Sequence, residues 1–249
     1  NDCDGVVDNG CARVSCTYLC PPAPPELHRL QIEPPQPAGS LPATFVVTDD
    51  GSSSYRIPLR VPPGRAGLRP DLSLVYNSRS GNGLLGMGWS LGGFSQIRRC
   101  SKTIVRDGVV APIEMVPQDA LCLDGVRLVQ VTPNTCGPLQ DEYKPERDSF
   151  SRICRSFAPN IFEVFTADGR KLTYGSLISP GGDANIRTPE GILGWALSQV
   201  SDRQGNRMAY SYFTPRLFGE IERRPREIRY TSNDSGVGAR WTVQFEYVS

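Results

Sequence analysis

The sequence is poor in histidine and lacks a long hydrophobic segment. His28 is the single histidine among 249 residues. Histidine is the side chain best suited to acid–base catalysis at neutral pH and the commonest metal ligand. A chain with one histidine therefore has few residues for either acid–base or metal catalysis. No apolar run approaches the roughly 20 residues that a membrane-spanning helix requires. The composition therefore argues against a histidine-dependent enzyme and against a helical membrane protein.

An excess of charge of one sign is also missing. The chain holds 27 lysines and arginines against 26 aspartates and glutamates, for a formal net charge of +1. Nucleic acids and anionic membranes attract strongly basic proteins. Because charges of both signs are mixed along the chain, we expect neither a nucleic-acid partner nor an anionic membrane.

The sequence shows no leader segment. It begins at Asn1 and not at methionine, and no charged-then-apolar stretch follows. We therefore expect a mature fragment or an excised domain, whose targeting cannot be read directly.

Cysteine is present in an even number but without a C-x-x-C pair. This pattern favours disulfides over a zinc site, and so an oxidising compartment. We expect disulfides in the N-terminal cluster. For the other four, disulfides and scattered buried thiols both stay open, since free cysteine is a small and often buried residue. The cluster is Cys3, Cys11, Cys16 and Cys20, and the other four are Cys100, Cys122, Cys136 and Cys154.

Glycine and proline are abundant, at 25 and 22 residues, which favours many turns and short strands over long helices. Alternating apolar and polar residues predict an all-β fold, mostly antiparallel and built from hairpins, and no helical pattern exceeds about two turns. Pro138–Asn160 is the region with the weakest pattern. The predicted strands are Thr44–Thr48, Ser54–Val61, Asp71–Tyr76, Phe94–Cys100, Lys102–Arg106, Ala120–Val131, Ile161–Thr166, Lys171–Tyr174, Trp195–Val200, Met208–Phe213, Arg226–Thr231 and Arg240–Val248.

A short unit recurs in which an Asp/Gly turn precedes a strand that bears tyrosine. The clearer copies are Asp168–Tyr174 and Asp202–Tyr210, and the weaker ones begin at Asp107-Gly108 and Asp124-Gly125. An Asp-Gly turn between alternating strands is a strong hairpin signal. The unit resembles the Rhs/YD-repeat hairpin, in which successive hairpins extend one sheet.

Composition divides the chain into three parts. Residues 1–20 form the end of an irregular module rich in cysteine and aspartate, and residues 21–43 carry eight prolines and predict an extended linker. Residues 44–249 hold the predicted β domain.

Asp2, Asp4 and Asp8 are the candidate metal ligands. Their spacing around Gly5 resembles the middle of a calcium-binding loop, in which carboxylates at alternate positions face the ion. The match is partial, because Cys11 takes the place of the bidentate glutamate. The alternative is a cysteine-stapled end of a linker, and we expect no other cofactor.

Two motifs that suggest catalysis lack their required context. Gly88-Trp-Ser90-Leu-Gly92 matches the G-x-S-x-G nucleophile elbow, but no histidine follows Ser90 to serve as its base. We expect a glycine-rich sheet bend with Trp89 buried as a plug. Glu220-Ile-Glu222 matches the E-x-E of arginine-directed ADP-ribosyltransferases. The partner strands of that enzyme are missing before it, so we expect a solvated acidic pair. We therefore predict no enzyme activity and no catalytic residues.

An ordered set of motifs resembles the SpvB family, which includes the N-terminal domain of the Salmonella virulence plasmid B proteins and is shared with the B subunits of bacterial Tc toxins. The motifs fall between Ser52 and Tyr247. They are Tyr55–Leu59, Pro62–Arg65, Pro70–Ser78, Gly81–Leu91, Cys122–Gly125, Phe150–Arg152, Trp195–Ser198 and Asp202–Asn206.

This resemblance implies a structural role for residues 44–249. It implies a non-catalytic domain of a secreted bacterial toxin or Rhs-type virulence protein, within a β shell that encapsulates or presents a C-terminal toxin. The implied partners are downstream domains of the same chain (a propeller, Rhs repeats and the toxin cargo) and a toxin pore subunit. The implied localisation is secreted or at the cell surface, and family members also reach the host cytoplasm.

A second function remains open from the sequence. The chain is alternatively a secreted or cell-surface adhesion module, made calcium-dependent by Asp2, Asp4 and Asp8. That alternative predicts a clustered aromatic surface and metal-dependent stability, whereas the shell predicts neither. The last predicted strand suggests a sheet edge that pairs with other residues, so we also expect the isolated chain to be marginally stable or prone to aggregation.

Overall fold

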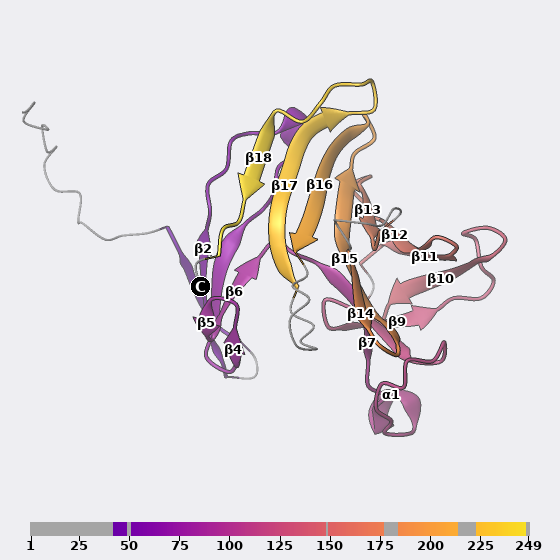
Figure 1. Cartoon of the computed structure of the whole chain (residues 1–249). Helices are drawn as coiled ribbons and strands as arrows, with labels where there is room; N and C mark the ends of the chain where they lie inside the picture. The colour runs from indigo at the N-terminus through magenta and orange to yellow at the C-terminus, as the bar shows by residue number, and fades with distance from the viewer. Residues whose placement is uncertain (1–41, 49–50, 148, 177–183, 214–222, 248–249) are drawn as a thin grey trace, which may run out of the picture. The chain divides into compact units, whose positions relative to one another are not determined.

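The computed structural model describes residues 42–48, 51–147, 149–176, 184–213 and 223–247. These residues belong to the compact unit Pro42–Ser249, and the other unit is Asn1–Leu41. Predictions on the N-terminal cysteines, on the linker before Pro42 and on Glu220-Ile-Glu222 lie outside the described residues. The described part is almost entirely β (Figure 1), which confirms the predicted all-β class.

The first part of this unit is a four-stranded antiparallel sheet in the order β1-β2-β3-β6. Its strands are short because glycine and proline punctuate the sequence between them. The connection from β2 to β3 contains a 3-10 turn, η1 (Arg65–Gly67), and the hairpin of β4 (Asn82–Gly83) and β5 (Gly86–Met87) precedes β6. The four strands are β1 (Thr44–Val47), β2 (Ser53–Pro58), β3 (Ser73–Asn77) and β6 (Trp89–Gly92).

The second part is a barrel-like sheet of eight antiparallel strands. Seven of them follow one another along the chain as a meander, and each pairs with the next. The eighth, β15, pairs with both ends of that meander. The strands are β7 (Gln96–Cys100), β8 (Ala120–Leu123), β9 (Val126–Gln130), β10 (Gln140–Pro145), β11 (Arg152–Phe157), β12 (Asn160–Phe165), β13 (Lys171–Tyr174) and β15 (Gly191–Ser201).

The barrel closes because β15 is long enough to pair with different strands along its length. Trp195 lies opposite Ile97 of β7, whereas Val200 lies opposite Leu172 of β13. The register of the β13–β15 pair shifts next to Tyr174, an irregularity of the kind that bends strands in barrels. Closure covers the edges that β7 and β13 would otherwise expose.

The sheet also extends beyond the barrel. β14 (Asn185–Thr188) pairs with the first half of β15, and β16 (Asn206–Phe213) pairs with its second half. β17 (Arg224–Asn233) and β18 (Trp241–Gln244) continue outward from β16. Figure 1 shows β16, β17 and β18 side by side in orange and yellow. Among the described residues, β18 pairs with β17 alone and so forms an edge of the sheet.

One core cluster spans the barrel and its extension. The Trp195 side chain is fully buried and meets the Phe162 ring edge-on at 4.8 Å between centroids. Its indole nitrogen donates to Oδ1 of Asn160 at 3.2 Å, which satisfies the polar atom that burial would otherwise leave unpaired. Ile228 and Tyr230 of β17 are also fully buried in this cluster. Full burial of such a side chain stabilises the fold by about 1.5–3 kcal/mol.

Two predicted strands are wrong. Lys102–Arg106 is not a strand, because the chain forms helix α1 at Ile104–Asp107. The Asp107 carboxylate accepts a hydrogen bond from the Thr103 amide at 2.8 Å, and Gly108 ends the turn at φ 68°. A helix-ending glycine in this conformation is common, so Asp107-Gly108 closes a helical turn and does not start a hairpin.

Ala120–Val131, predicted as one strand, is a hairpin of β8 and β9. Asp124 and Gly125 both have positive φ, at 47° and 85°, as a two-residue turn of the hairpin type requires. The structure also contains six strands that were not predicted from the sequence. β10 and β11 lie in the region of weak pattern, β4, β5 and β6 lie in the glycine-dense stretch that was expected to be a bend, and the sixth is β14.

Candidate functional site

The residues of the suspected nucleophile motif lie in a strand and not in a strand–turn–helix. Ser90 is exposed on β6, opposite Val75 of β3, and its hydroxyl donates to the Val75 carbonyl at 3.4 Å. The structure therefore places Ser90 in a strand of a sheet, where the sequence predicted a glycine-rich bend. His28 and the Glu220-Ile-Glu222 motif lie outside the described residues.

The predicted metal ligands Asp2, Asp4 and Asp8 also lie outside the described residues. Among the residues that the structure describes, no three histidine, cysteine, aspartate or glutamate side chains gather as a metal site would require. Over the same residues, no helix is both long and apolar enough to span a bilayer.

The four later cysteines form two disulfides. Cys100 of β7 is bonded to Cys122 of β8, and Cys136 is bonded to Cys154 of β11. This resolves the alternative that the sequence left open in favour of disulfides over buried thiols. Both bonds lie within the barrel, where they tie neighbouring segments of the meander together.

A polar network links the first barrel strand to the β8–β9 turn. The Asp124 carboxylate accepts hydrogen bonds from the Gln96 amide at 2.8 Å and from the Ser95 hydroxyl. The Ser95 hydroxyl also lies 2.9 Å from the Tyr174 hydroxyl. Burial raises the pKa of Tyr174 well above its ordinary value. The neutral tyrosine, the serine and the aspartate thus hold three segments together, which is a structural role.

Four aromatic side chains form a cross-strand row on the four-stranded sheet. Phe45 of β1 lies opposite Tyr55 of β2, Tyr55 opposite Tyr76 of β3, and Tyr76 opposite Trp89 of β6. Residues in register on neighbouring strands point to the same face. The Tyr76 and Trp89 ring centroids are 5.4 Å apart. Because neighbouring strands are ~4.8 Å apart, the row spans roughly 14 Å.

Glycine makes room for this row. Gly88 has φ 77°, and a Cβ atom there would lie 2.6 Å from Cε2 of Tyr76. Any side chain at Gly88 would therefore collide with the tyrosine ring. The glycine-dense stretch that the sequence interprets as a sheet bend thus serves to let aromatic rings cover the backbone.

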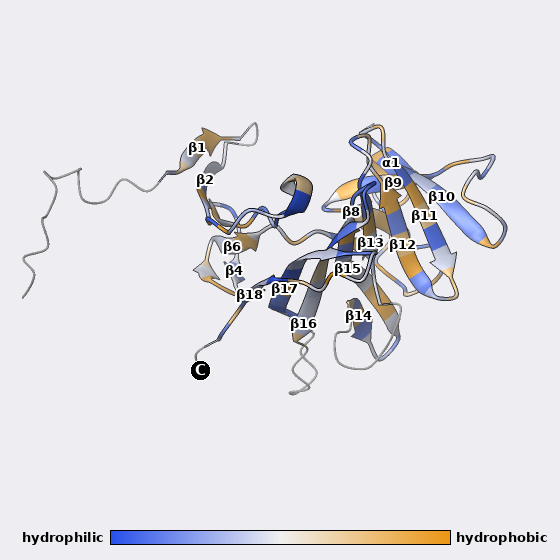
Figure 2. Cartoon of the chain, turned by 90° about the horizontal axis from the view of Figure 1, so that it is seen from above, coloured by the Kyte–Doolittle hydropathy of each residue, from blue (hydrophilic) through white to orange (hydrophobic). Residues whose placement is uncertain are grey.

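The aromatic row belongs to a wider apolar surface, which we call the aromatic face. None of its residues is buried, and none packs against the core cluster. Phe45 and Val47 are 62% and 60% exposed, and Figure 2 shows the hydrophobic colour along β1. The aromatic face consists of Phe45, Val47, Tyr55, Ile57, Leu74, Tyr76, Trp89 and Leu91.

The prediction that Trp89 is a buried plug is wrong. The Trp89 side chain is only half-buried and lies at the end of the aromatic row. The alternation of residues in the sequence shows which side chains share a face within one strand. Only the register between β2 and β3 shows that Tyr55 and Tyr76 belong to one row. The hairpin-forming signals in the sequence do not specify that register, so the row could not be predicted.

Comparison with known proteins finds a family model that matches part of the chain. Residues 47–126 match the family model of the Salmonella virulence plasmid 65kDa B protein, SpvB. This confirms the resemblance that the sequence motifs suggest. No match was found among curated protein sequences.

Solved structures extend the likeness of fold. A crystal structure of TcdB2-TccC3 matches 83% of this chain at 19% identity with a TM-score of 0.63. The Photorhabdus luminescens Tc holotoxin pore matches 76% at 21% identity with a TM-score of 0.58. The N-terminal domain of the effector protein SpvB from Salmonella typhimurium strain LT2 matches 77% at 20% identity with a TM-score of 0.59.

These matches differ in how much of the other chain they cover. This chain spans 12% of the TcdB2-TccC3 chain and 10% of the holotoxin chain, but 72% of the SpvB domain chain. The shared fold is therefore that of a β-rich domain which, in the Tc structures, is a small part of a much longer polypeptide.

Proposed function

We propose that residues 44–249 form a non-catalytic structural domain of a secreted bacterial toxin or Rhs-type protein. In this proposal the domain is one segment of a β shell that encapsulates or presents a C-terminal toxin. Its partners are the downstream propeller, Rhs repeats and cargo of the same polypeptide, together with a toxin pore subunit.

The observation that carries this proposal is the likeness of fold to a domain that makes up about a tenth of the Tc chains. The aromatic face adds a surface that a neighbouring domain could cover. A row of four aromatic residues on a sheet with half-exposed and exposed side chains is unusual for a surface that meets only water. The edges at β1 and β18 add backbone groups that can pair with further strands. The likeness of fold to about a tenth of the Tc chains supports a domain that works inside a larger assembly.

The hydrogen bonds of polar side chains support the non-catalytic part of this proposal. Ser90 bonds a strand carbonyl, and Asp124 bonds a serine and a backbone amide. Ser90 and Asp124 each hold strands or segments together. They do not meet in one cavity, as the nucleophile, acid and base of an active site would.

The test is to purify the complete gene product that contains this chain and to image it by cryo-electron microscopy. We expect a hollow particle with this domain in its wall, and a C-terminal segment that protease cannot reach until the shell is opened. A string of separate modules, or a C-terminal segment that is cleaved at once, would contradict the proposal.

A second function is favoured by the same aromatic face. A secreted adhesion module predicts clustered aromatic residues, and the row of Phe45, Tyr55, Tyr76 and Trp89 provides them. In its calcium-dependent form, Asp2, Asp4 and Asp8 hold the ion. The two functions are separated by removal of divalent cations with EDTA. A fall in the thermal midpoint that calcium restores would favour the adhesion module, whereas an unchanged midpoint would favour the shell.

A further inference from the structure

The connection between β2 and β3 carries an unusual concentration of positive charge. Residues 51–100 hold seven arginines, one aspartate and no lysine or glutamate, although the whole chain is nearly neutral. Arg60, Arg65 and Arg69 lie within this connection and are all exposed. No acidic partner exists for these three side chains among the residues that the structure describes. Unpaired guanidinium groups on one short segment form a site for carboxylates.

Three clefts follow this connection, and arginine lines each of them. The first, of about 340 Å³, is lined by Arg56, Arg69 and Arg170. The second, of about 330 Å³, shares Arg69 with the first and adds Arg60. The third, of about 300 Å³, is lined by Arg65 together with Arg240 of the segment before β18. The first two clefts share Arg69 and are here called the arginine groove.

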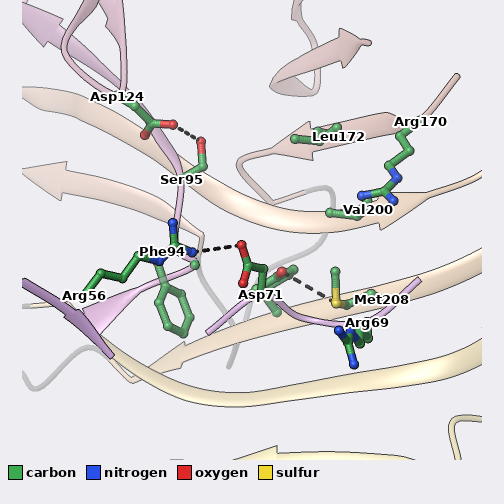
Figure 3. Close-up of a pocket in the computed structure, with 12 residues that line it drawn as sticks. Arg56, Arg69, Asp71, Phe94, Ser95, Asp124, Arg170, Leu172, Val200 and Met208 are labelled. Carbon is green, nitrogen blue, oxygen red and sulfur yellow. Dashed lines mark hydrogen bonds and ion pairs between the residues drawn. The ribbon is translucent and has the colours of Figure 1, made fainter. Parts of the chain in front are cut away.

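The first cleft is lined by charged and apolar side chains together. In Figure 3, Arg170 lies beside Leu172 and Val200, and Arg69 lies beside Met208. Arg56 is paired with Asp71 at 2.9 Å, and Arg170 with Asp168 at 3.1 Å. Of the three arginines that line the cleft, Arg69 is the one without an acidic partner among the described residues. Its guanidinium group lies beside apolar surface, which suits a ligand that carries both aliphatic and acidic side chains.

A buried hydroxyl points to the same kind of ligand. Tyr210 lines the first cleft and is only 7% exposed. Its hydroxyl bonds the sulfur of Met208 at 3.6 Å, a weak acceptor. A carboxylate or carbonyl oxygen in the cleft would be a much better partner for this donor.

The groove is held in place before any ligand arrives. The Tyr230 hydroxyl donates to the Pro62 carbonyl at 3.0 Å, and Leu68 is buried in the core. A Cβ atom at Gly64 would lie 1.8 Å from the Leu68 carbonyl oxygen, so the connection can pack this tightly only with glycine there. A rigid groove loses little conformational entropy when a ligand binds.

We propose that the arginine groove binds an extended acidic polypeptide segment in which acidic and aliphatic side chains alternate. Alternation gives such a segment both carboxylate and aliphatic side chains along its length, which suits clefts lined by both arginine and apolar side chains.

The test uses the 249-residue chain and a fluorescein-labelled peptide that alternates glutamate with leucine, followed by fluorescence anisotropy. We expect saturable binding that weakens as salt is added, because exposed charge pairs are screened. The same peptide with lysine in place of glutamate should not bind. The double variant Arg60→Glu/Arg69→Glu should bind the acidic peptide at least about tenfold more weakly.

A matched control is Arg147→Glu/Arg226→Glu, which changes net charge equally at exposed arginines outside the three clefts. It should keep affinity within about twofold, and circular dichroism should show that both double variants are folded. The proposal is overturned if the acidic peptide does not bind, if both double variants weaken it equally, or if a labelled single-stranded oligonucleotide binds more tightly. It stands or falls independently of the shell and adhesion functions.

Discussion

Arg99 and Asp119 form an ion pair that is buried on both sides. Their side chains are 8% and 4% exposed, and Nη1 of Arg99 lies 3.1 Å from Oδ2 of Asp119. The guanidinium also donates to the carbonyl oxygens of Ile192 and Val116. One arginine therefore fastens the start of β15 to the segment before β8. A charge in this position is tolerated only while its partners remain.

Replacing Asp119 alone should thus lower the free energy of unfolding more than replacing Arg99 and Asp119 together. Asp119→Ala should lower the free energy of unfolding by about 3 kcal/mol, because the Arg99 charge stays buried without its carboxylate. The double variant Arg99→Leu/Asp119→Leu should lose less free energy of unfolding, since it leaves no unpaired charge in the interior. Urea unfolding at neutral pH measures both. A single variant within about 0.5 kcal/mol of the wild type would show that the pair contributes nothing.

Glu142 gives the fold a dependence on pH. Its carboxylate is buried and accepts hydrogen bonds from the amide and the hydroxyl of Thr135, both at 2.6 Å. These bonds hold the pKa of Glu142 below its ordinary value of 4.5. The charged form is the one that the folded state favours. Its stabilising effect is therefore complete above the unfolded pKa and is lost as the pH falls through the folded pKa.

Glu142→Gln should remove this titration. At neutral pH the variant should be less stable than the wild type, and the difference should narrow as the pH falls from about 6 to about 3. Urea unfolding at several pH values measures the two free energies. A difference that stays constant over this range would show that Glu142 is not linked to acid sensitivity.

Interactions at this scale were beyond prediction from the sequence. Arg99 and Asp119 are separated by 20 positions, and nothing local distinguishes Asp119 from the other acidic residues. The pairing depends on β7 and β8 adopting one register, in which Arg99 lies opposite Leu121. Asp124-Gly125 carries its turn signal in two adjacent residues, but Asp107-Gly108 carries the same signal and ends a helical turn. The dipeptide alone therefore did not separate a hairpin from a helix end, and Ala120–Val131 was predicted as one strand.

At the scale of elements, the disulfides reinforce the barrel meander. Cys100–Cys122 closes a segment with a sequence separation of 22, between β7 and β8. Such a cross-link restricts the unfolded chain and stabilises the fold by about 3 kcal/mol for a loop of this size.

Cys100→Ser/Cys122→Ser should therefore lower the urea midpoint of unfolding. Dithiothreitol should lower the wild-type midpoint further, because it also opens Cys136–Cys154. A variant as stable as the wild type would show that β7–β8 pairing needs no cross-link.

Alternation identified strands that have one buried face and missed strands that do not. β16 alternates buried and more exposed residues along its length, and it was predicted from Met208 onward. β10 reads Gln-Asp-Glu-Tyr-Lys-Pro and has one large apolar side chain, Tyr143. It is a strand because it pairs with both β9 and β11. Tertiary pairing of this kind overrides local propensity, so local patterns could not reveal it.

At the scale of the whole chain, barrel closure was the feature least accessible to sequence reasoning. Each hairpin of the meander forms between neighbouring segments, and short connections of this kind are the usual arrangement. The β13–β15 and β7–β15 pairings instead join segments far apart in the chain, such as Ile97 and Trp195. Family resemblance predicted a β shell segment, but neither composition nor periodicity predicted that its described strands would close on themselves.

The uncovered aromatic face predicts how the isolated chain behaves in solution. Exposed apolar sheet surfaces and free edges promote association between copies, so the 249-residue chain should associate as its concentration rises. Phe45→Ser/Val47→Ser removes two of the most exposed side chains of the face, and it should weaken association by about tenfold. Because neither residue is part of the core cluster, the variant should remain folded.

The matched control for this variant is Ile104→Ser/Val105→Ser on α1. These side chains are 68% and 95% exposed, so the control removes a similar apolar area at a site away from the four-stranded sheet. Sedimentation equilibrium measures association for all three proteins. The control should associate like the wild type, because the aromatic face is intact. A wild-type chain that stays monomeric and unfolds in one sharp transition would contradict the prediction, as would equal loss of association in both variants. Either result would mean that the aromatic face does not need a partner, so the face would no longer support a domain that others cover.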